Sequence, residues 1–583
     1  MNKSGTVAGE IGPLLADAGL TLIDTYLQSL PEVPHPPMPA WEMPSIPASL
    51  VEQAATVQPL QPGGGVREFV AVLGVSAASA NGRFYFVQHM DNITRMVAEA
   101  QIIVVVVPLE KITGDQTEAE DLCRAQARHG IQGLYRDFSR RDRGGLALED
   151  LPLLDRPGGL GLSLNVILLD NGRSALARQP AGDLLRCIGC RACAVACPTQ
   201  RYFGGPANLN PREYILGALQ GRVEDVSLCV LCGLCKDACP VDIDMPRFLA
   251  ERKAREAETR GVTLSSWLLG NARTVSRLSS AVAPLANAML ANPLARTLME
   301  KTTGITRNHR LTRYASESFE AWWARHTPRT GGRKVAYFTG CYATYSAPEI
   351  ARAFVEVMER NGFEVVRPPQ RCSGLPLIAN GQEAAARGDA QFNLAQLGAL
   401  VREGCEIVTT CTSCSYTLRK EYPRLLGDAA SELTARVHDA TSFIMALYAR
   451  NELKPPLGRI EAAVAYHLSC HGRASGLGDT SVRLMNLIPG IQAAAVNRGC
   501  CGQAGTFGLK CGNYGMAMQI GSPLLEAIRR PEIDIPSTDC PTCKMQMEHG
   551  SGRPVMHPVI LLRDSYVAAR PAETEPHGTH RDA

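Results

Sequence analysis

A cysteine run of the form C-x2-C-x2-C-x3-C-P decides the fold in the middle of the chain: Cys187-Ile-Gly-Cys-Arg-Ala-Cys-Ala-Val-Ala-Cys-Pro198. The same form returns as Cys229-Val-Leu-Cys-Gly-Leu-Cys-Lys-Asp-Ala-Cys-Pro240. Such short spacing wraps backbone N–H groups around whatever the thiolates hold, and each closing proline turns the chain away without needing a hydrogen-bond donor. Paired runs of this kind hold two [4Fe–4S] clusters, each bound by three cysteines of one run and the last cysteine of the other.

The expected ligand sets therefore cross between the two runs. One cluster takes Cys187, Cys190, Cys193 and Cys239, and the other takes Cys229, Cys232, Cys235 and Cys197. This is the form of a bacterial two-cluster ferredoxin, and a predicted helix over Pro211 to Leu219 suits the helical variant of that module. A zinc ribbon is the alternative, but tetrahedral zinc needs no interleaved runs. Nearby arginines would raise the cluster potentials or form plain solvated surface: Arg186, Arg191, Arg201 and Arg222.

The composition describes a multidomain protein. Its 583 residues exceed what one hydrophobic core usually serves, so three or four domains are expected. A net charge of +3 is too balanced for a nucleic-acid binder. We find no apolar run long enough for a membrane span and no secretory signal pattern, so we expect a cytoplasmic protein. A set of 20 cysteines then indicates metal ligands rather than disulfides, because the cytoplasm is reducing.

The last third of the chain repeats itself. Three pairs of cysteines share an offset of 128 or 129 positions: Cys341 with Cys470, Cys372 with Cys500, and Cys411 with Cys540. Strand, loop and helix patterns alternate from Gly331 onward, which is typical of a mainly parallel sheet. We therefore expect a duplicated α/β domain whose cysteines follow strand ends, where open sheets form their ligand crevices.

The two copies differ in their cysteine count. The second copy has five: Cys470, Cys500, Cys501, Cys540 and Cys543. The first copy has four: Cys341, Cys372, Cys411 and Cys414. Ser373 stands where the second copy has Cys501. Five thiolates are too many for one tetrahedral metal and suit a multi-iron cluster, whereas four are enough for a cubane.

Residues 331–568 resemble a pair of cysteine-rich "CCG" domains of the heterodisulfide reductase type, in particular the iron–sulfur C subunits of anaerobic glycerol-3-phosphate dehydrogenases. The motifs are Gly374-Leu-Pro-Leu-Ile-Ala-Asn-Gly381, Cys500-Cys-Gly-Gln-Ala-Gly-Thr-Phe-Gly508, and Asp539-Cys-Pro-Thr-Cys-Lys-Met-Gln546 through His557-Pro558. The resemblance implies a noncubane [4Fe–4S] cluster at the five-cysteine site. At the first copy, where Ser373 departs from the pattern, we expect a further [4Fe–4S] cluster of the cubane type.

A second resemblance lies upstream. Val166-Ile-Leu-Leu-Asp-Asn-Gly-Arg-Ser174 and Leu185-Arg-Cys-Ile-Gly-Cys-Arg-Ala-Cys193 are similar to the lactate-utilisation iron–sulfur proteins, and residues 84–112 match the same family. That family's LUD domain is longer, so this copy looks truncated.

The expected fold class is multidomain α/β: a truncated LUD-like α/β domain, a helical dicluster ferredoxin and tandem α/β CCG domains. Strand-like runs surround a predicted helix at 116–129 in the first of these. The expected boundaries are 1–65 for an amphipathic helix over 9–30 and a proline-rich linker, 66–176 LUD-like, 177–255 ferredoxin, 256–330 helical cationic linker, 331–455 first CCG, 456–568 second CCG, and 569–583 a disordered tail.

Several other residues carry open alternatives. Three cysteines outside the groups are expected to be small buried apolar residues: Cys123, Cys405 and Cys511. Three histidines beside the second set would tune a cluster, relay protons or be satisfied structural residues: His467, His471 and His557. Residues 259–299 hold no Asp or Glu, and would lie on a membrane or partner helix or form an interdomain helical hairpin.

The chain shows no G-x-G-x-x-G or Walker loop, so no flavin, nicotinamide or ATP site is expected on it. We expect an oxidoreductase component that carries electrons from a flavoprotein dehydrogenase of a small hydroxy acid or glycerol 3-phosphate toward a quinone or another acceptor. It would be cytoplasmic or peripheral on the inner face of the cell membrane. The alternative is a heterodisulfide-reductase-like subunit that reduces a disulfide at the noncubane cluster, against which Ser373 counts. A zinc-binding scaffold is a third possibility. The sequence assigns no catalytic residue.

Overall fold

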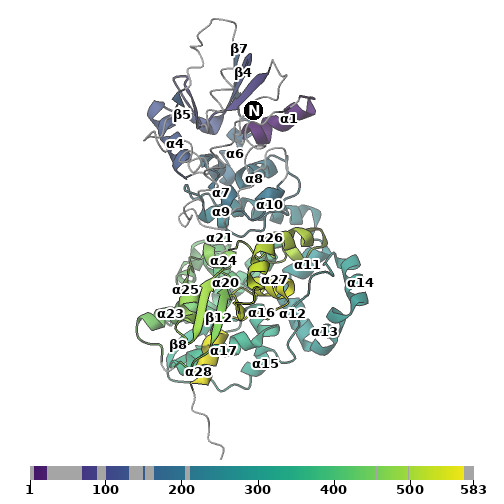
Figure 1. The fold of residues 1–583 in the computed structure, drawn as a ribbon, viewed down its shortest axis with the longest axis vertical. Coiled ribbons are helices and arrows are strands. Elements are labelled where there is room, and N and C mark those ends of the chain that lie inside the picture. The colour runs from purple at the N-terminus through teal and green to yellow at the C-terminus, as the bar shows by residue number, and fades with distance from the viewer. Residues whose placement is uncertain are drawn as a thin grey trace, which may run out of the picture. The chain divides into compact units, whose positions relative to one another are not determined.

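The computed structural model describes residues 6–20, 22, 69–87, 100–129, 149–150, 163–203, 210–454, 457–496 and 498–569. The chain divides into two compact units, Met1–Arg252 and Lys253–Ala583, whose elements are labelled in Figure 1. The expected proline-rich linker and the tail after residue 569 lie outside the described residues. Within the described ranges, no helix is both long enough and apolar enough to cross a membrane.

The first unit begins with helical structure that is shorter than expected. A π-helical turn over Val7–Ile11 runs into α1 (Gly12–Asp17), whereas the sequence pattern suggested one helix over 9–30. Gly19 has a φ of +80°, and the N–H of Leu20 donates to the carbonyl of Leu15. A left-handed glycine with such a bond ends an α-helix, so the expectation was wrong about where this helix stops.

Two small sheets follow. The parallel order β1–β4–β7 joins Val70–Gly74, Ile102–Pro108 and Ser163–Leu169, with Ile103, Val105 and Val107 in its core. A second sheet has the order β5–β2–β3–β6, made of Ile112–Thr113, Ala77–Ser79, Phe84–Phe86 and Glu149–Asp150. Helix α4 (Gln116–His129) packs on β2 and has the bounds that its sequence predicts.

The cysteine runs lie among short helices. These are α6 (Arg173–Leu176), the 3-10 helix Pro180–Arg186, α7 (Ala192–Ala196), α8 (Pro211–Leu219), α9 (Leu234–Asp237) and α10 (Met245–Arg260). Helix α8 has the predicted bounds because Asn210 and Glu213 form a capping box at its start and Pro211 occupies its first turn. Helices α7 and α9, one from each run, pack against each other.

The acid-free stretch is a series of short helices rather than a hairpin: α11 (Leu264–Gly270), α12 (Ala272–Ala281), α13 (Ala283–Ala291) and α14 (Pro293–Thr303). Local capping explains the difference. Thr263 caps α11, and Asn292 followed by Pro293 starts α14. Each signal starts a new helix, so two long antiparallel helices cannot form. Helix α15 (Phe319–Trp323) follows.

The first cysteine-rich repeat has a four-stranded parallel sheet of order β11–β10–β8–β9. Its strands are Arg333–Tyr337 (β8), Phe363–Val366 (β9), Glu406–Thr409 (β10) and Val437–Asp439 (β11). Its main helices are α16 (Gly340–Tyr345), α17 (Pro348–Arg360), α18 (Leu375–Ala379), α19 (Glu383–Arg402), α20 (Thr412–Tyr416) and α23 (Ala440–Ala449). The sheet is parallel, as the alternating pattern predicted.

The second repeat has a three-stranded parallel sheet of order β13–β12–β14, made of Ile491–Ala495 (β13), Ala462–Tyr466 (β12) and Ile535–Ser537 (β14). These strands correspond to β9, β8 and β10 of the first repeat, in the same spatial order. A parallel bridge from Ser537 to Met556 takes the place of the fourth strand. Its helices are α24 (Cys470–Ala474), α25 (Thr480–Met485), α26 (Tyr514–Ile528), α27 (Pro541–Ser551) and α28 (Pro558–Ala568). The shared strand order supports a duplication.

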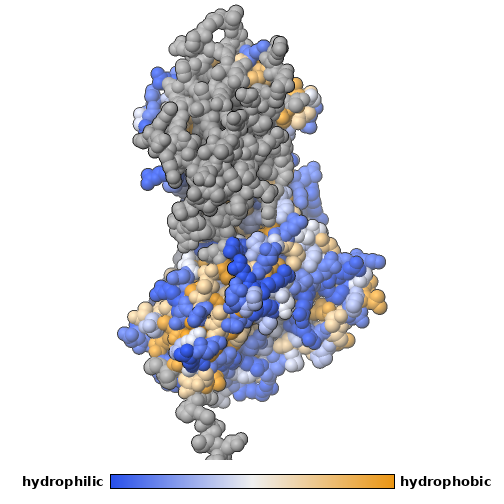
Figure 2. Space-filling view, in the orientation of Figure 1, coloured by the Kyte–Doolittle hydropathy of each residue, from blue (hydrophilic) through white to orange (hydrophobic). Residues whose placement is uncertain are grey.

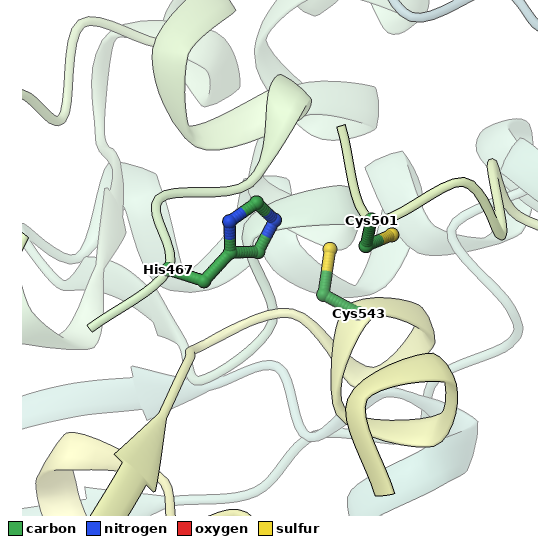
Figure 3. Close-up of side chains that lie close together, drawn as sticks. All are labelled: His467, Cys501 and Cys543. Carbon is green, nitrogen blue, oxygen red and sulfur yellow. The ribbon is translucent and has the colours of Figure 1, made fainter. Parts of the chain in front are cut away.

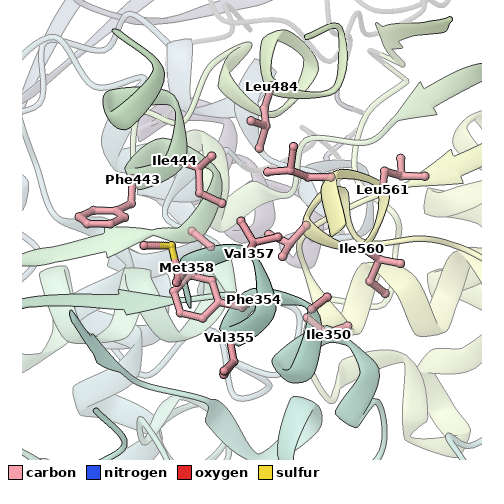
Figure 4. Packing of buried hydrophobic residues seen from close by; sticks show 14 of the residues in the cluster. Ile350, Phe354, Val355, Val357, Met358, Phe443, Ile444, Leu484, Ile560 and Leu561 are labelled. Atoms are coloured by element: carbon pink, nitrogen blue, oxygen red, sulfur yellow. The ribbon is translucent and has the colours of Figure 1, made fainter. Parts of the chain in front are cut away.

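The two repeats share one hydrophobic core. Helix α17 of the first repeat packs against α28 of the second, and α25 of the second packs against α23 of the first. Figure 4 shows side chains from these helices meeting, among them Phe354, Leu484 and Ile560. Because each repeat lends its last helix to the other, the repeats stabilise each other.

Candidate iron–sulfur sites

The eight cysteines of the two runs lie in the first unit, and the crossed ligand sets expected for them stay a prediction. Burial and then the charges of Cys187 and Cys239 raise the pKa of Cys190 to about 11. Burial and then the charge of Cys229, a cysteine of the other run, raise the pKa of Cys197 to about 11. Backbone N–H groups point at the sulfurs, with Gly189 donating to Cys187 Sγ over 3.4 Å. These thiols are arranged to hold an anionic group among N–H donors.

Two basic residues that the sequence did not single out, Lys111 and Arg212, lie near these thiols. Lys111 Nζ donates to the carbonyl of Cys187 over 2.8 Å. Arg212 is buried, and it pairs with Glu110 over 2.6 Å. Although burial opposes it, the nearby Cys187 thiolate and Glu110 hold the pKa of Arg212 above its ordinary value. Glu110 also pairs with Arg173 over 2.6 Å, so a buried network of charges adjoins this run.

The arginines that the sequence did single out lie in other settings. Arg186 is exposed and 4.0 Å from Asp183, Arg191 is 4.0 Å from Glu213, and Arg222 donates to the carbonyl of Gly9 over 2.8 Å.

The first cysteine-rich repeat gathers its four thiols at the carboxyl ends of three strands. Cys341 lies on α16 after β8, Cys372 lies in the loop after β9, and Cys411 and Cys414 lie at the start of α20 after β10. The central strand β8 is flanked by β9 and β10, so this is the switch point where open parallel sheets bind ligands. The thiols of Cys341 and Cys372 are hydrogen-bonded, and the N–H of Cys414 donates to Cys411 Sγ over 3.3 Å. Ser373 is buried beside Cys372.

The second repeat gathers five thiols in the corresponding place. Cys470 Sγ and Cys500 Sγ lie 3.8 Å apart. Cys501 is hydrogen-bonded to both Cys500 and Cys543, and Cys543 also to Cys540, so the five form an unbroken series. Gly502 has a φ of +85°, and a Cβ there would lie 1.9 Å from the carbonyl oxygen of Ala517. Only glycine fits after the cysteine pair, which explains the third residue of the Cys-Cys-Gly motif.

The protonation of these thiols fits a site for iron. A hydrogen bond to Cys341 and then burial raise the pKa of Cys372 well above its ordinary value. Hydrogen bonds from Cys500 and Cys543 lower the pKa of Cys501 to about 5. Crowded buried thiols thus share protons that a bound cation would displace, which is how thiolate sites couple metal binding to proton release. Both donor sets fit iron–sulfur clusters, which thiolates bind.

The two sites of the second unit touch. Ser413, which lies between Cys411 and Cys414, has its Oγ 3.6 Å from Cys540 Sγ and 3.0 Å from His471 Nδ1. The adjoining Thr412 Oγ1 lies 3.0 Å from Ser469 Oγ. A loop carrying thiols of one site therefore packs directly on the thiols of the other.

A buried carboxylate pair lies behind this contact. Ser481 donates to Asp539 over 2.7 Å, and Ser415 donates to Asp439 over 3.0 Å. Burial and then the charge of Asp539 raise the pKa of Asp439 to about 7. No sequence pattern pointed to this pair, because its members lie 100 positions apart.

The three histidines differ in their surroundings. His557 is a satisfied structural residue: Nε2 lies 2.9 Å from the Thr410 carbonyl, and Nδ1 accepts from the N–H of Val559. His471 bonds Ser413 and stacks on Tyr416 with 4.6 Å between ring centroids. His467 is buried, and burial lowers its pKa to about 4. Its ring enters the second site beside Cys501 and Cys543 (Figure 3).

The cysteines outside the groups agree with expectation in two cases of three. Cys123 and Cys405 are buried. Cys511 is exposed, so the expectation that it is buried was wrong. It begins a 3-10 turn, Cys511–Asn513, and its thiol is hydrogen-bonded to the side chain of Glu300.

Comparison with known proteins identifies two kinds of domain. The family described as "4Fe-4S dicluster domain" matches residues 183–243, and the "Cysteine-rich domain" family matches residues 335–419 and 464–548. Both matched regions contain the thiol groups described above. The chain is thus in the class of iron–sulfur electron-transfer components of oxidoreductases that join a dicluster domain to paired cysteine-rich domains.

Curated relatives narrow this class. The chain is 30% identical over 385 residues to the C subunit of anaerobic glycerol-3-phosphate dehydrogenase from Escherichia coli K12, covering 64% of this chain and 97% of the relative. It is 26% identical to the B subunit of fumarate reductase (CoM/CoB) from Methanothermobacter marburgensis (64% and 68%). It is 25% identical to the D subunit of dihydromethanophenazine:CoB–CoM heterodisulfide reductase from Methanosarcina barkeri (66% and 92%). The chain belongs to the family of the anaerobic glycerol-3-phosphate dehydrogenase C subunits.

Proposed function

We propose that this chain is the subunit that carries electrons from a flavoprotein dehydrogenase of glycerol 3-phosphate or a small hydroxy acid toward a quinone or other acceptor. The observation that supports this most is that Ser413, which lies between the first-site residues Cys411 and Cys414, contacts Cys540 of the second site, because electrons pass most readily between centres that lie close together. The chain is similar to a glycerol-3-phosphate dehydrogenase subunit over almost the whole length of that subunit, which supports a dehydrogenase of this kind as the partner.

The proposed cofactors are two [4Fe–4S] cubanes, one noncubane [4Fe–4S] cluster and one further [4Fe–4S] cluster. Clusters of this kind take up and release single electrons. The ligand sets are Cys187, Cys190, Cys193 and Cys239; Cys229, Cys232, Cys235 and Cys197; Cys341, Cys372, Cys411 and Cys414; and Cys470, Cys500, Cys501, Cys540 and Cys543. Cys501→Ala tests this division, because it should remove the noncubane EPR signal while the ferredoxin signals stay. Loss of all signals together would contradict it.

We further propose the domain limits given above, including a truncated LUD-like domain over residues 66–176. The two small sheets there are compatible with it.

The helices α11–α14 are proposed to rest on a membrane surface. Nine large apolar side chains are exposed between residues 262 and 298, and the acid-free stretch is cationic. Figure 2 shows apolar side chains along the α13 and α14 edge of the second unit. Anionic lipid would attract such a surface and take up its leucines. Co-sedimentation with phosphatidylglycerol vesicles should be lost on Leu285→Ser with Leu294→Ser, but kept on Val567→Ser, which changes an exposed residue on α28.

Reconstitution tests the proposed function itself. Reduction of a quinone analogue by glycerol 3-phosphate, with the flavoprotein partner and this chain both present, supports it. Activity that does not need this chain contradicts it. The competing function is disulfide reduction at the second site, which the intact five-thiol set and the heterodisulfide reductase relative favour. Disulfide turnover by the isolated chain with a reduced dye would support that competitor.

A further inference from the structure

The backbone holds His467 firmly at the second cysteine-rich site. It directly follows β12, its N–H donates to the carbonyl of Ser537 over 2.8 Å, and its carbonyl accepts from Thr538 Oγ1 over 2.9 Å. Only 1% of the residue is exposed. The sheet therefore fixes the backbone from which the imidazole projects.

Neither ring nitrogen of His467 has a hydrogen-bond partner among the described residues. Burying an unpaired polar group costs about 1–3 kcal/mol, so buried groups of this kind normally have a partner. The unpaired ring shares the site with two sulfurs, because one of its nitrogens, Cys501 Sγ and Cys543 Sγ all lie within 4.8 Å of one another. Figure 3 shows the three side chains entering one space from three segments of the chain.

The first repeat supplies an internal comparison. Phe338 stands at the place of His467, and its N–H donates to the carbonyl of Val408 over 2.9 Å in the equivalent bond. Phe338 is fully buried. The first repeat also has Ser373 where the second has Cys501. The repeat that lacks the fifth thiol thus also lacks the imidazole, and the two differences concern groups that lie together in the second site.

We propose that His467 is a nitrogen ligand to iron at the second site, together with Cys501 and Cys543. Imidazole is a suitable ligand for iron, and it binds as the neutral ring. This inference rests on the proposed function to the extent that the second site holds a cluster. It adds a donor that the five-cysteine pattern does not contain.

The test is pulsed EPR of the full chain, prepared anaerobically with 15N-histidine and poised where the second-site cluster is paramagnetic. We expect a histidine 15N coupling stronger than any coupling from backbone amides in the same spectrum. This experiment uses no substitution, so it does not depend on a variant folding. A second-site signal without such a coupling, or with only a weak one, would overturn the proposal.

Variants give an independent measurement. His467→Phe copies the residue that the first repeat accommodates, and it should abolish the histidine coupling. His471→Gln is the matched control, since His471 also neighbours Cys470, and it should keep the coupling. The iron and sulfide content of the protein distinguishes failure of the ligand assignment from failure of the proposed function. Full content without histidine coupling removes only the ligand assignment, whereas an empty second site removes the proposed electron route as well.

Discussion

Ser413 Oγ lies 3.6 Å from Cys540 Sγ, so a hydroxyl of the first cysteine-rich repeat contacts a thiol of the second. Ser413 belongs to the first repeat and stands between Cys411 and Cys414, while Cys540 belongs to the second. Hydrogen bonds to cluster sulfurs raise reduction potentials. The same contact therefore shortens the path between the sites and biases the potential of the second.

Ser413→Ala should lower the potential of the second-site cluster. A hydrogen bond that differs by ~1 kcal/mol between redox states corresponds to about 40 mV for a one-electron couple. Potentiometric titration followed by EPR measures the shift. Ser522→Ala is the control, because the hydroxyl of Ser522 donates to the carbonyl of Gln519 within α26. Equal potentials in the two variants would contradict the role of Ser413.

Ser373→Cys should give the first site the five-thiolate set of the second site. Ser373 is buried beside Cys372 and occupies the position of Cys501 in the other repeat. A fifth thiolate there should change the EPR spectrum of the first site toward that of the noncubane cluster. An unchanged spectrum would mean that the first site is built differently from our assignment.

Lys111→Met should lower the potential of the cluster next to Cys187. Its Nζ donates to the carbonyl of Cys187, and loss of a nearby positive charge disfavours the reduced, more negative cluster. An effect on the order of 1 kcal/mol corresponds to about 40 mV. Arg124→Met on the same unit is the control, since Arg124 pairs with Glu120 and Asp121 on exposed helix surface. If both variants shift the potential equally, Lys111 has no special effect.

Asp439 should make stability fall as the pH rises. Burial and Asp539 raise its pKa from 3.8 to about 7 in the folded state. A carboxyl group whose pKa is raised on folding stabilises most below its unfolded pKa, and that contribution is lost as the pH rises through the folded value. Thermal unfolding of the anaerobic protein between pH 5 and pH 8 measures this. Asp439→Asn should flatten the dependence, and a slope identical to wild type would count against the assignment.

Phe354→Ala should destabilise both cysteine-rich repeats together. Phe354 is fully buried in the shared core, with its ring centroid 4.4 Å from that of Tyr337. Removing such a side chain costs about 3–5 kcal/mol, and Phe354→Leu should cost much less. Urea unfolding followed by circular dichroism gives the loss. Independent unfolding of one repeat while the other keeps its stability would contradict a shared core.

The sequence predicted features whose causes are local. The bounds of α8 follow from Asn210, Pro211 and Glu213, which are consecutive or nearly so. The parallel sheets follow from alternating strand and helix patterns, and the offset of 128 or 129 positions predicted a repeated topology. Each of these signals can be read within one segment or by comparing two.

Features that depend on distant packing could not be predicted in this way. Lys111 reaches Cys187 across 76 positions, and Ser413 reaches Cys540 across 127. The packing of α23 and α28 against helices of the other repeat cannot be recognised from the sequence of either helix alone. Cys511 was expected to be buried on its residue type, yet the short turn that it begins leaves it exposed.

The most direct test of the electron route is the content of iron and acid-labile sulfide in anaerobically purified protein, combined with EPR of its reduced and oxidised forms. Four clusters predict about sixteen iron per chain, counting about four per [4Fe–4S] cluster, with one signal unlike a cubane. A content near eight would mean that the cysteine-rich repeats hold no cluster, and the route would end at the ferredoxin segment. Zinc without sulfide would contradict the account as a whole.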